Sequence, residues 1–273
     1  MRKALCSILA EAGNKLLKAR SFSVTEKEGH ANYVTDVDKR LQDMLMERLR
    51  ALCPEAQFIG EERTNQKLTA APTWVVDPID GTTNFIHDYH CSVISAALLV
   101  DRVPQVGVVC QPYLHEVYSA ERGKGAFTND EPMHVSRHDF DHALVGFGTS
   151  PYQAELGQPT MDIALAFLRR CADIRRCGSA AADLAYVACG RQDVFFELNL
   201  KPWDIAAGSL LVTEAGGTFD MPLLDRPDFD TPTTMFAANA ICAAPAKEML
   251  VALLRSHSIP GADGEADEMR TPF

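Results

Sequence analysis

The chain has 273 residues, of which 47% are hydrophobic and 23% are charged, and these are ordinary values for a globular protein. This length is enough to bury a substantial core in one large domain or in two closely joined ones. The formal net charge of -11 argues against a broad attraction to nucleic-acid backbones or anionic lipid, so we expect no nucleic-acid partner and no membrane partner. If the substrate is an anion, a local feature must reverse the sign of the charge.

Cysteine usage and apolar runs indicate the compartment. Eight cysteines are scattered through apolar stretches without C-x-x-C spacing. This pattern indicates that the cysteines act as small hydrophobic residues in a reducing compartment, and it argues against a disulfide framework or a zinc site. Glu11 interrupts the apolar start of the chain, and the longest apolar run, Val93 to Val100, is too short to span a bilayer. We therefore expect a soluble cytoplasmic protein.

In the first half, about residues 1–140, the pattern predicts two helices and then a meander. The first helix carries apolar residues at helical spacing, and the second begins near Asp36 or Asp38 and stops before Pro54. Between them lies a polar, glycine-containing stretch typical of a mobile connection. Short strands follow at 57–60 and 73–77, and β-rich runs joined by turn residues fill 91–120, as in an antiparallel meander.

In the second half, about residues 141–258, strand-like and helical segments alternate. Strands are predicted at 143–147, 173–177 and 193–198, and helices at 161–171, 180–190 and 204–217. This alternation favours helices layered against a sheet. Residues 259–273 are acidic and poor in large apolar side chains, so we expect a solvated tail.

The stretch "TWVVDPIDGTTNF" places two carboxylates at the end of an apolar strand. Asp77 follows the strand, Pro78 and Gly81 shape a turn, and Asp80 can point back toward Asp77. Two such charges about 4 Å apart repel by roughly 4 kcal/mol at an effective dielectric of 20, so the pair needs a cation or a shared proton. The alternative is an ordinary turn, since Asp, Pro and Gly are common turn formers.

Further carboxylates occur at the ends of other predicted elements. Glu61 and Glu62 end a short strand, and Asp204 and the pair Asp36 and Asp38 stand at helix starts, where capping is the alternative role. Hard oxygen ligands of this kind suit magnesium or manganese, and the absence of Cys and His from these stretches argues against zinc.

Backbone N–H groups after the acidic pair offer a place for an anion. If a helical turn begins at Gly81, Thr82 and Thr83, its free N–H groups form a cradle for a phosphate whose oxygens bridge metals held by Asp77 and Asp80. Paired metals can align an attacking hydroxide and a leaving oxygen across phosphorus. Thr82 is then the candidate to orient the attacking water.

The segments "DPIDGTTNF", "GEE" and "WDIAAG...EAGG" together resemble the inositol monophosphatase family, and the likeness runs from the first helix to about residue 255. The resemblance implies a single phosphatase domain over residues 1–258, a mixed α/β (α+β) fold built as a layered αβαβα sandwich, and a homodimer. It also implies dependence on Mg²⁺, with two to three ions and Mn²⁺ as a possible substitute, and inhibition by lithium.

The resemblance also assigns roles by position. It implies that Glu61, Asp77 and the carbonyl of Ile79 hold one magnesium, that Asp77, Asp80 and Asp204 hold a second, and that Glu61 contributes to a weaker third. It further implies that Thr82 and Glu61 position the water, that Asp38 bonds to Thr82, and that Gly81 and Thr82 donate to phosphate. The implied contacts to substrate hydroxyls come from Asp80, the backbone at Ala180 and Glu197, and Lys27 matches a lysine on a mobile loop.

The resulting expectation is a phosphomonoesterase acting on myo-inositol monophosphate or a related small polyol phosphate. Two alternatives stay open. One is a sister phosphatase acting on histidinol phosphate, fructose 1,6-bisphosphate or a 3'-phosphorylated nucleotide. The other is a non-catalytic regulatory protein that uses the fold as a docking surface.

Overall fold

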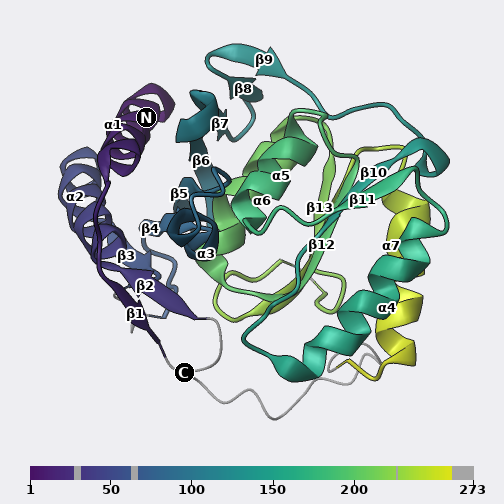
Figure 1. Ribbon diagram of the computed structural model, residues 1–273. Coiled ribbons are helices and arrows are strands. Elements are labelled where there is room, and N and C mark those ends of the chain that lie inside the picture. The colour runs from purple at the N-terminus through teal and green to yellow at the C-terminus, as the bar shows by residue number, and fades with distance from the viewer. Residues whose placement is uncertain (28–31, 63–66, 226, 260–273) are drawn as a thin grey trace.

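Two helices form the first of five layers (Figure 1). In the computed structural model, which describes residues 1–27, 32–62, 67–225 and 227–259, α1 (Arg2–Lys18) packs beside α2 (Asp36–Leu52). Each buries leucines at helical spacing, and the Thr35 side chain caps α2 through the N–H groups of Val37 and Asp38. Both predicted helices are therefore present.

The second layer is a seven-stranded sheet with the order β3-β4-β5-β6-β7-β8-β9. Only the β3 and β4 pair is parallel, and β5, β6 and β7 form the predicted meander. The strands are β3 (Gln57–Gly60), β4 (Thr73–Asp80), β5 (Val93–Val100), β6 (Val103–Gln111), β7 (Glu116–Glu121), β8 (Ala126–Thr128) and β9 (Glu131–Met133). All of β4 is buried, which is why its sequence is a continuous apolar run broken only by the two aspartates.

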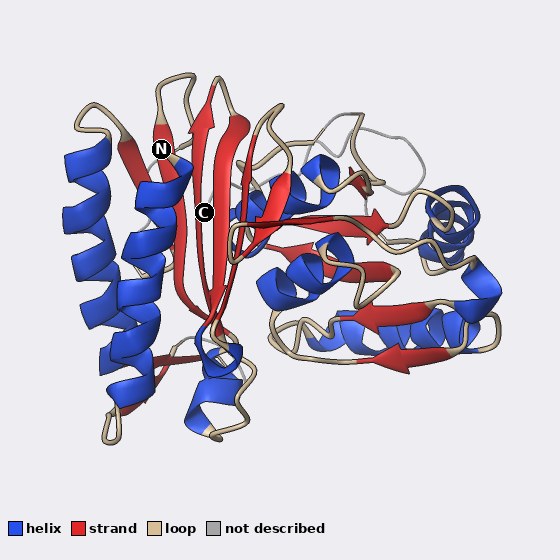
Figure 2. Ribbon diagram, turned by 90° about the horizontal axis from the view of Figure 1, so that it is seen from above, coloured by secondary structure: helices blue, strands red, loops and turns tan. Residues whose placement is uncertain are grey.

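Helices α5 (Ala180–Ala188) and α6 (Pro202–Glu214) make the middle layer, between the two sheets (Figure 2). They are rich in alanine because the backbones approach closely. A Cβ at Gly107 of β6 would lie 2.9 Å from the carbonyl oxygen of Ala207 on α6, so only glycine permits this packing. Burial on both sides also explains why α6 has little polar surface.

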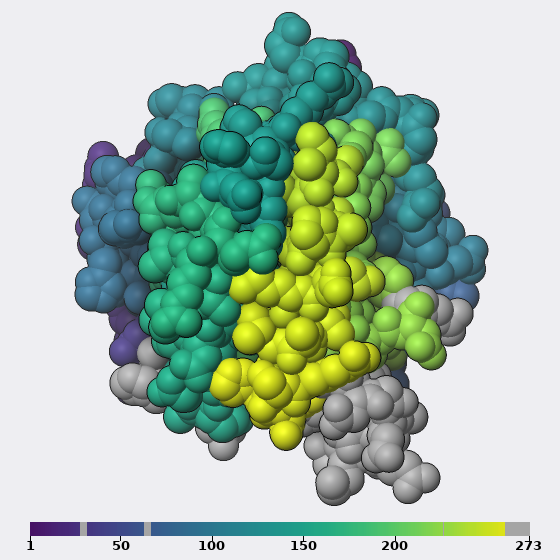
Figure 3. Space-filling model, turned by 90° about the vertical axis from the view of Figure 1, so that its right-hand side faces the viewer, coloured from purple at the N-terminus to yellow at the C-terminus, as the bar shows by residue number. Residues whose placement is uncertain are grey.

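The fourth layer is a five-stranded sheet with the order β11-β10-β12-β14-β13. Its strands are β10 (Leu144–Phe147), β11 (Asp173–Arg175), β12 (Val194–Leu200), β13 (Thr218–Asp220) and β14 (Thr233–Ala238). Outside it, α4 (Gly157–Leu168) and α7 (Ala243–Ser256) lie side by side (Figure 3). Three apolar clusters fill the interfaces between the five layers, and the central cluster joins α5 and α6 to both sheets.

The smaller elements complete the chain. They are the short helix α3 (Thr82–Ile86), the strands β1 (Val24–Glu26) and β2 (Tyr33–Thr35), and three 3-10 turns, η1 (Pro112–Leu114), η2 (Phe140–His142) and η3 (Ala154–Leu156). Where the sequence suggested a mobile connection, the antiparallel pair β1 and β2 is formed. Of the solvated tail predicted for 259–273, residues 260–273 lie outside the described residues.

The layered αβαβα sandwich and the mixed α/β class are confirmed by this arrangement. No sequence pattern predicted β13, β14 or α7, and β4 continues through Asp80 where a turn after Asp77 was expected. Among the helices of the described ranges, none combines the length and apolarity that crossing a bilayer requires.

Candidate active site

An irregularity in β4 brings its two aspartates together. In a regular strand, residues three apart point to opposite faces, but the pairing of β4 with β5 shifts register between Asp77 and Asp80. Pro78 lies in this interval and lacks an N–H for the ladder. The carboxylates of Asp77, Asp80 and Asp204 consequently offer oxygen atoms that all lie within 4.8 Å of one another.

Asp204 arrives at this group from the first turn of α6. One of its oxygens, Oδ2, accepts a hydrogen bond of 2.7 Å from the N–H of Lys201, just before the helix. The Asp204 side chain thus caps the start of α6 and also lies beside Asp77 and Asp80. The capping role is therefore confirmed, and the same carboxylate also faces two other acids.

Burial raises the pKa of all three carboxylates, and neighbouring acids raise it further at Asp77 and Asp204. For Asp77 and Asp204, burial is the largest cause, followed by the charges of the neighbouring acids, and both pKa values lie well above the usual range. Burial also raises the pKa of Asp80 to about 6, against hydrogen bonds from Ser179 and Ala181 that lower it. Such a group holds protons until a cation replaces them. The same oxygen-only donor set is the kind that Mg²⁺ or Mn²⁺ prefers.

Glu61 stands at the edge of this group, directly after β3. Burial raises its pKa to about 7, against the opposing charge of Lys27, and its own charge is the largest Coulombic cause of the raised pKa of Asp77. The Lys27 ammonium lies 2.9 Å from a Glu61 oxygen and 2.5 Å from a Glu62 oxygen. A cationic side chain on the loop after β1 therefore pairs with the acids at this edge.

Thr82 connects the acidic group to α2. Its hydroxyl lies 3.0 Å from the carbonyl oxygen of Ile79 and 3.3 Å from Oδ1 of Asp38. The other Asp38 oxygen accepts from the N–H of Thr35 at 2.8 Å and from the Thr35 hydroxyl. Burial raises the pKa of Asp38 to about 6. The predicted contact between Asp38 and Thr82 is present, and Asp38 also fills the capping role.

Gly81 makes the turn from β4 into α3. Its φ is +87°, and a Cβ there would lie 3.0 Å from the carbonyl oxygen of Cys91, so any other residue would be strained and crowded. The helix begins with the hydrogen bond from the Phe85 N–H to the Gly81 carbonyl. The helical turn that the sequence suggested at Gly81, Thr82 and Thr83 is therefore formed, although the Gly81 N–H lies against the Asp80 carboxylate.

Glu197 lies on the side of α5 and β12. It is buried, it accepts a 3.2 Å hydrogen bond from the N–H of Ser150, and burial raises its pKa to about 7. Asp80 increases this pKa further by its charge. The first residue of α5 is Ala180. The structure thus brings the predicted residues of β4, α3, α5, α6 and β12 to one edge of the two sheets.

Several side chains in this region were not identified from the sequence. The Ser179 hydroxyl and the Ala181 N–H donate to Oδ2 of Asp80 at 2.8 and 2.6 Å. A serine before three alanines is a helix-cap pattern, and this signal could have identified Ser179. Tyr152 also lies near the acids: its side chain is 58% exposed, and the pKa of its hydroxyl is raised by desolvation and by the charges of Asp204 and Glu197. Its sequence neighbourhood carries no comparable signal.

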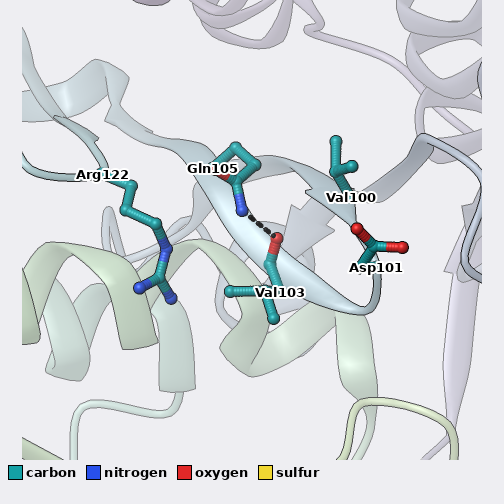
Figure 4. A pocket seen from close by; sticks show the side chains of 5 residues that line it. All are labelled: Val100, Asp101, Val103, Gln105 and Arg122. Atoms are coloured by element: carbon teal, nitrogen blue, oxygen red, sulfur yellow. Dashed lines mark hydrogen bonds between the residues drawn. The ribbon is translucent and has the colours of Figure 1, made fainter.

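A hollow on the surface lies away from this acidic group. It has a volume of about 380 Å³ beside the β5 to β6 turn, and Figure 4 shows that Val100, Asp101, Val103, Gln105 and Arg122 line it. Asp80 pairs with Val93 at the opposite end of β5. With one carboxylate and one guanidinium it offers no comparable set of ligands, so the acidic edge is the candidate active site.

The family is settled by a match of the inositol monophosphatase family model to residues 1–258. The chain belongs to this family. It is 40% identical over 200 residues to inositol monophosphatase 3 of Solanum lycopersicum, covering 70% of this chain and 74% of that protein. It is also 36% identical over 243 residues to Nus factor SuhB of Xylella fastidiosa, covering 84% of this chain and 86% of that protein.

A solved structure is similar over most of the chain. A crystal structure of an IMPase/NADP phosphatase complexed with Mg²⁺ and phosphate superposes with a TM-score of 0.81 at 25% identity, covering 90% of this chain and 93% of that one. Family membership and these relatives support a phosphatase of the inositol monophosphatase fold.

Proposed function

We propose that the protein is a Mg²⁺-dependent phosphomonoesterase that hydrolyses myo-inositol monophosphate or a related small polyol phosphate. One observation carries the proposal: Asp77, Asp80 and Asp204 hold oxygen atoms within 4.8 Å of one another in a setting that raises the pKa of each. Near neutral pH, protons bind too weakly to neutralise these three carboxylates fully. A hard divalent cation neutralises their charge more effectively.

The donor set fits two to three such ions. In this proposal Glu61, Asp77 and the Ile79 carbonyl hold one, Asp77, Asp80 and Asp204 hold another, and Glu61 contributes to a weaker third, with Mn²⁺ as a substitute. When bound, the ions lower the pKa of a water molecule and stabilise the charge that develops on the leaving oxygen.

The attacking water is oriented by Thr82 and Glu61. Because the single Thr82 hydroxyl proton is directed to Ile79 or Asp38, the oxygen of Thr82 is left to accept a hydrogen bond from water. Asp38 is a positioning residue in this scheme, since it acts through Thr82. In this scheme Glu61 is the carboxylate that accepts a proton from the same water.

The phosphate and the alcohol bind on opposite sides of Asp80. In this proposal the backbone N–H groups of Gly81 and Thr82 donate to the phosphate at the start of α3, where the Gly81 N–H leaves the Asp80 carboxylate when phosphate binds. Asp80, the backbone at Ala180 and Glu197 accept from or donate to the hydroxyls of the alcohol. The oxygen of Asp80 that faces α5 is fixed by Ser179 and Ala181, which orients the remaining oxygen.

A panel assay tests this function. Phosphate release by the purified protein is measured with myo-inositol 1-phosphate, glycerol 2-phosphate, histidinol phosphate, fructose 1,6-bisphosphate and a 3'-phosphorylated nucleotide. We expect turnover of the inositol ester with Mg²⁺, loss in EDTA and inhibition by Li⁺. Preference for another member of the panel would identify a sister phosphatase, and no release from any ester would contradict phosphatase function.

A second candidate is a regulatory protein that uses this fold as a docking surface. It is favoured by one relative, which is named a Nus factor and matches 84% of this chain. Capture of a specific protein partner, with equal recovery from wild type and from a variant with substituted metal ligands, would support this role. The full set of clustered acids favours catalysis, because docking alone does not require them.

The same proposal extends to the organisation of the protein. Residues 1–258 form a single phosphatase domain, the protein is a homodimer, and it works in the cytoplasm without a membrane or nucleic-acid partner. Light scattering of the purified chain measures the mass in solution and would contradict the dimer if it gave 29.9 kDa.

A further inference from the structure

Two half-buried cysteines from distant parts of the chain meet beside the candidate active site. Cys91 precedes β5, and Cys177 precedes α5. The side-chain amide of Asn84, on α3, donates to the carbonyl oxygen of Cys91 at 2.7 Å and to that of Cys177 at 2.9 Å. One nitrogen atom thus fixes the two backbone segments next to each other. The two thiols also interact, since the interaction of their side chains lowers the pKa of Cys91 and raises that of Cys177.

The surroundings distinguish Cys91 from the other cysteines, all eight of which lie in the described part of the chain. The hydrogen bond from the Cys177 thiol is the largest cause that lowers the pKa of Cys91, and the Arg176 charge lowers it further. Each of the other seven has a raised pKa, with burial as the largest cause in six and the bond to Cys91 as the largest for Cys177. Thiolate character and access are what make a cysteine reactive.

We propose that Cys91 and Cys177 form an oxidation site at which a peroxide closes a reversible intramolecular disulfide. The Cys91 thiolate attacks one peroxide oxygen, so an S–O bond forms, the O–O bond breaks and the released hydroxide takes up a proton to become water. The sulfur of Cys177 then attacks the resulting sulfenic acid. The S–S bond forms, and the hydroxyl group leaves as a second water with the Cys177 proton. The two thiols together supply the two electrons that reduce the peroxide.

The position of the pair connects it to the phosphatase chemistry, and this consequence rests on the proposed function. The Ser92 hydroxyl, next to Cys91, donates to the Gly81 carbonyl at 2.9 Å, and Ser179, two residues after Cys177, donates to Asp80. A disulfide between Cys91 and Cys177 would displace the two backbone segments that carry Ser92 and Ser179. Since small displacements in a catalytic site lower rates steeply, we expect roughly tenfold lower phosphate release in the oxidised protein, restored by dithiothreitol.

Mass spectrometry tests the site. The purified protein is treated with hydrogen peroxide, the remaining thiols are blocked with iodoacetamide, and the digest is searched for linked peptides. We expect the peptides of Cys91 and Cys177 as the main linked pair, lost on reduction. Cys91→Ser and Cys177→Ser should each abolish this pair, whereas the matched variants Cys171→Ser and Cys189→Ser, at other half-buried thiols, should retain it.

The outcomes separate this site from the proposed function, because the linked pair is detected without any activity. A linked pair in a protein that hydrolyses no ester would support the oxidation site and contradict the phosphatase. Active protein in which Cys91 stops at sulfinic acid, or in which other cysteines are linked instead, would overturn the oxidation site. A linked pair with unchanged activity would keep the site and remove its effect on catalysis.

Discussion

Two buried acidic centres in this molecule have opposite surroundings. Asp193, before β12, accepts hydrogen bonds from the Ser136 hydroxyl, from His138 Nδ1 at 3.1 Å, from the Leu144 N–H at 2.6 Å and from Asn239 Nδ2 at 3.1 Å. Asp77 accepts one bond of 2.9 Å from the N–H of Ile79 in its own turn, and it faces other carboxylates.

This difference separates structural acids from functional ones. A buried carboxylate surrounded by donors is stabilised within the fold and joins the segments that provide those donors. One that faces other carboxylates destabilises the fold until a cation arrives. Substitution should therefore have opposite consequences at the two centres: stability is lost at Asp193, and activity is lost at the Asp77 centre.

The largest effect is expected at the functional centre. Asp204→Asn removes one charge from the three-acid group but retains an oxygen that can accept from the Lys201 N–H. Phosphate release at saturating Mg²⁺ should fall by roughly 10³-fold, because charge stabilisation in the transition state is lost. Circular dichroism and the melting temperature should show an intact fold. Near-normal turnover would contradict the assignment of Asp204.

The next effect is expected at the structural centre. Asp193→Ala leaves the Leu144 N–H and the Asn239 amide without their buried acceptor, so the free energy of unfolding should fall by about 3 kcal/mol. Urea unfolding measures this change, and Asp193→Asn, which keeps one acceptor oxygen, should cost less. A loss below about 1 kcal/mol would show that the network is not a structural anchor.

The pH dependence of stability sharpens the contrast. The pKa values of Asp80 and Glu61 are raised to about 6 and about 7, so the folded metal-free protein binds protons more tightly than the unfolded chain. Their contribution is fully present below the unfolded pKa values and is lost as pH rises through 6 to 7. The melting temperature in EDTA should fall from pH 5 to pH 8, and added Mg²⁺ should raise it more at pH 8. Asp204→Asn should flatten the EDTA profile, and a wild-type profile that rises instead would contradict the raised values.

These two centres also show how far the sequence alone could predict the molecule. The acids of the candidate site stand at element ends within a recognisable motif, so Asp77, Asp80 and Asp204 could be named before their distances were known. Helical spacing and β-rich runs likewise predicted α1, α2 and the meander, since these patterns depend on local periodicity.

What escaped prediction depends on contacts between distant segments. The register shift in β4 arises from its pairing with β5, and the donors to Asp193 come from residues far apart in the chain. Strand β13 has only three residues, and β14 pairs with β12 across the intervening α6 and β13. The anchor at Asp193 has no local pattern that distinguishes function from structure, and the helix-cap pattern at Ser179 does not indicate its bond to Asp80.

The smallest effect is expected at Glu197, which shares features of both centres. It accepts from the Ser150 N–H, as a structural acid would, and burial followed by the charge of Asp80 raises its pKa to about 7, as at the functional centre. Glu197→Gln keeps an oxygen for Ser150 and removes the charge that is proposed to accept from the hydroxyls of the alcohol.

The expected result is a KM for myo-inositol 1-phosphate that rises roughly tenfold, since a hydrogen bond to a charged group is worth about 1.5–3 kcal/mol and the amide retains part of it. The matched substrate is 4-nitrophenyl phosphate, whose leaving group has no vicinal hydroxyls, and its KM and kcat should change little. A rise in KM for the inositol ester alone would show that Glu197 binds the alcohol and contributes to substrate specificity. If both substrates lost the same factor while the melting temperature fell, Glu197 would belong with Asp193 as a support of the fold, because a residue that reads hydroxyls cannot affect an ester that has none.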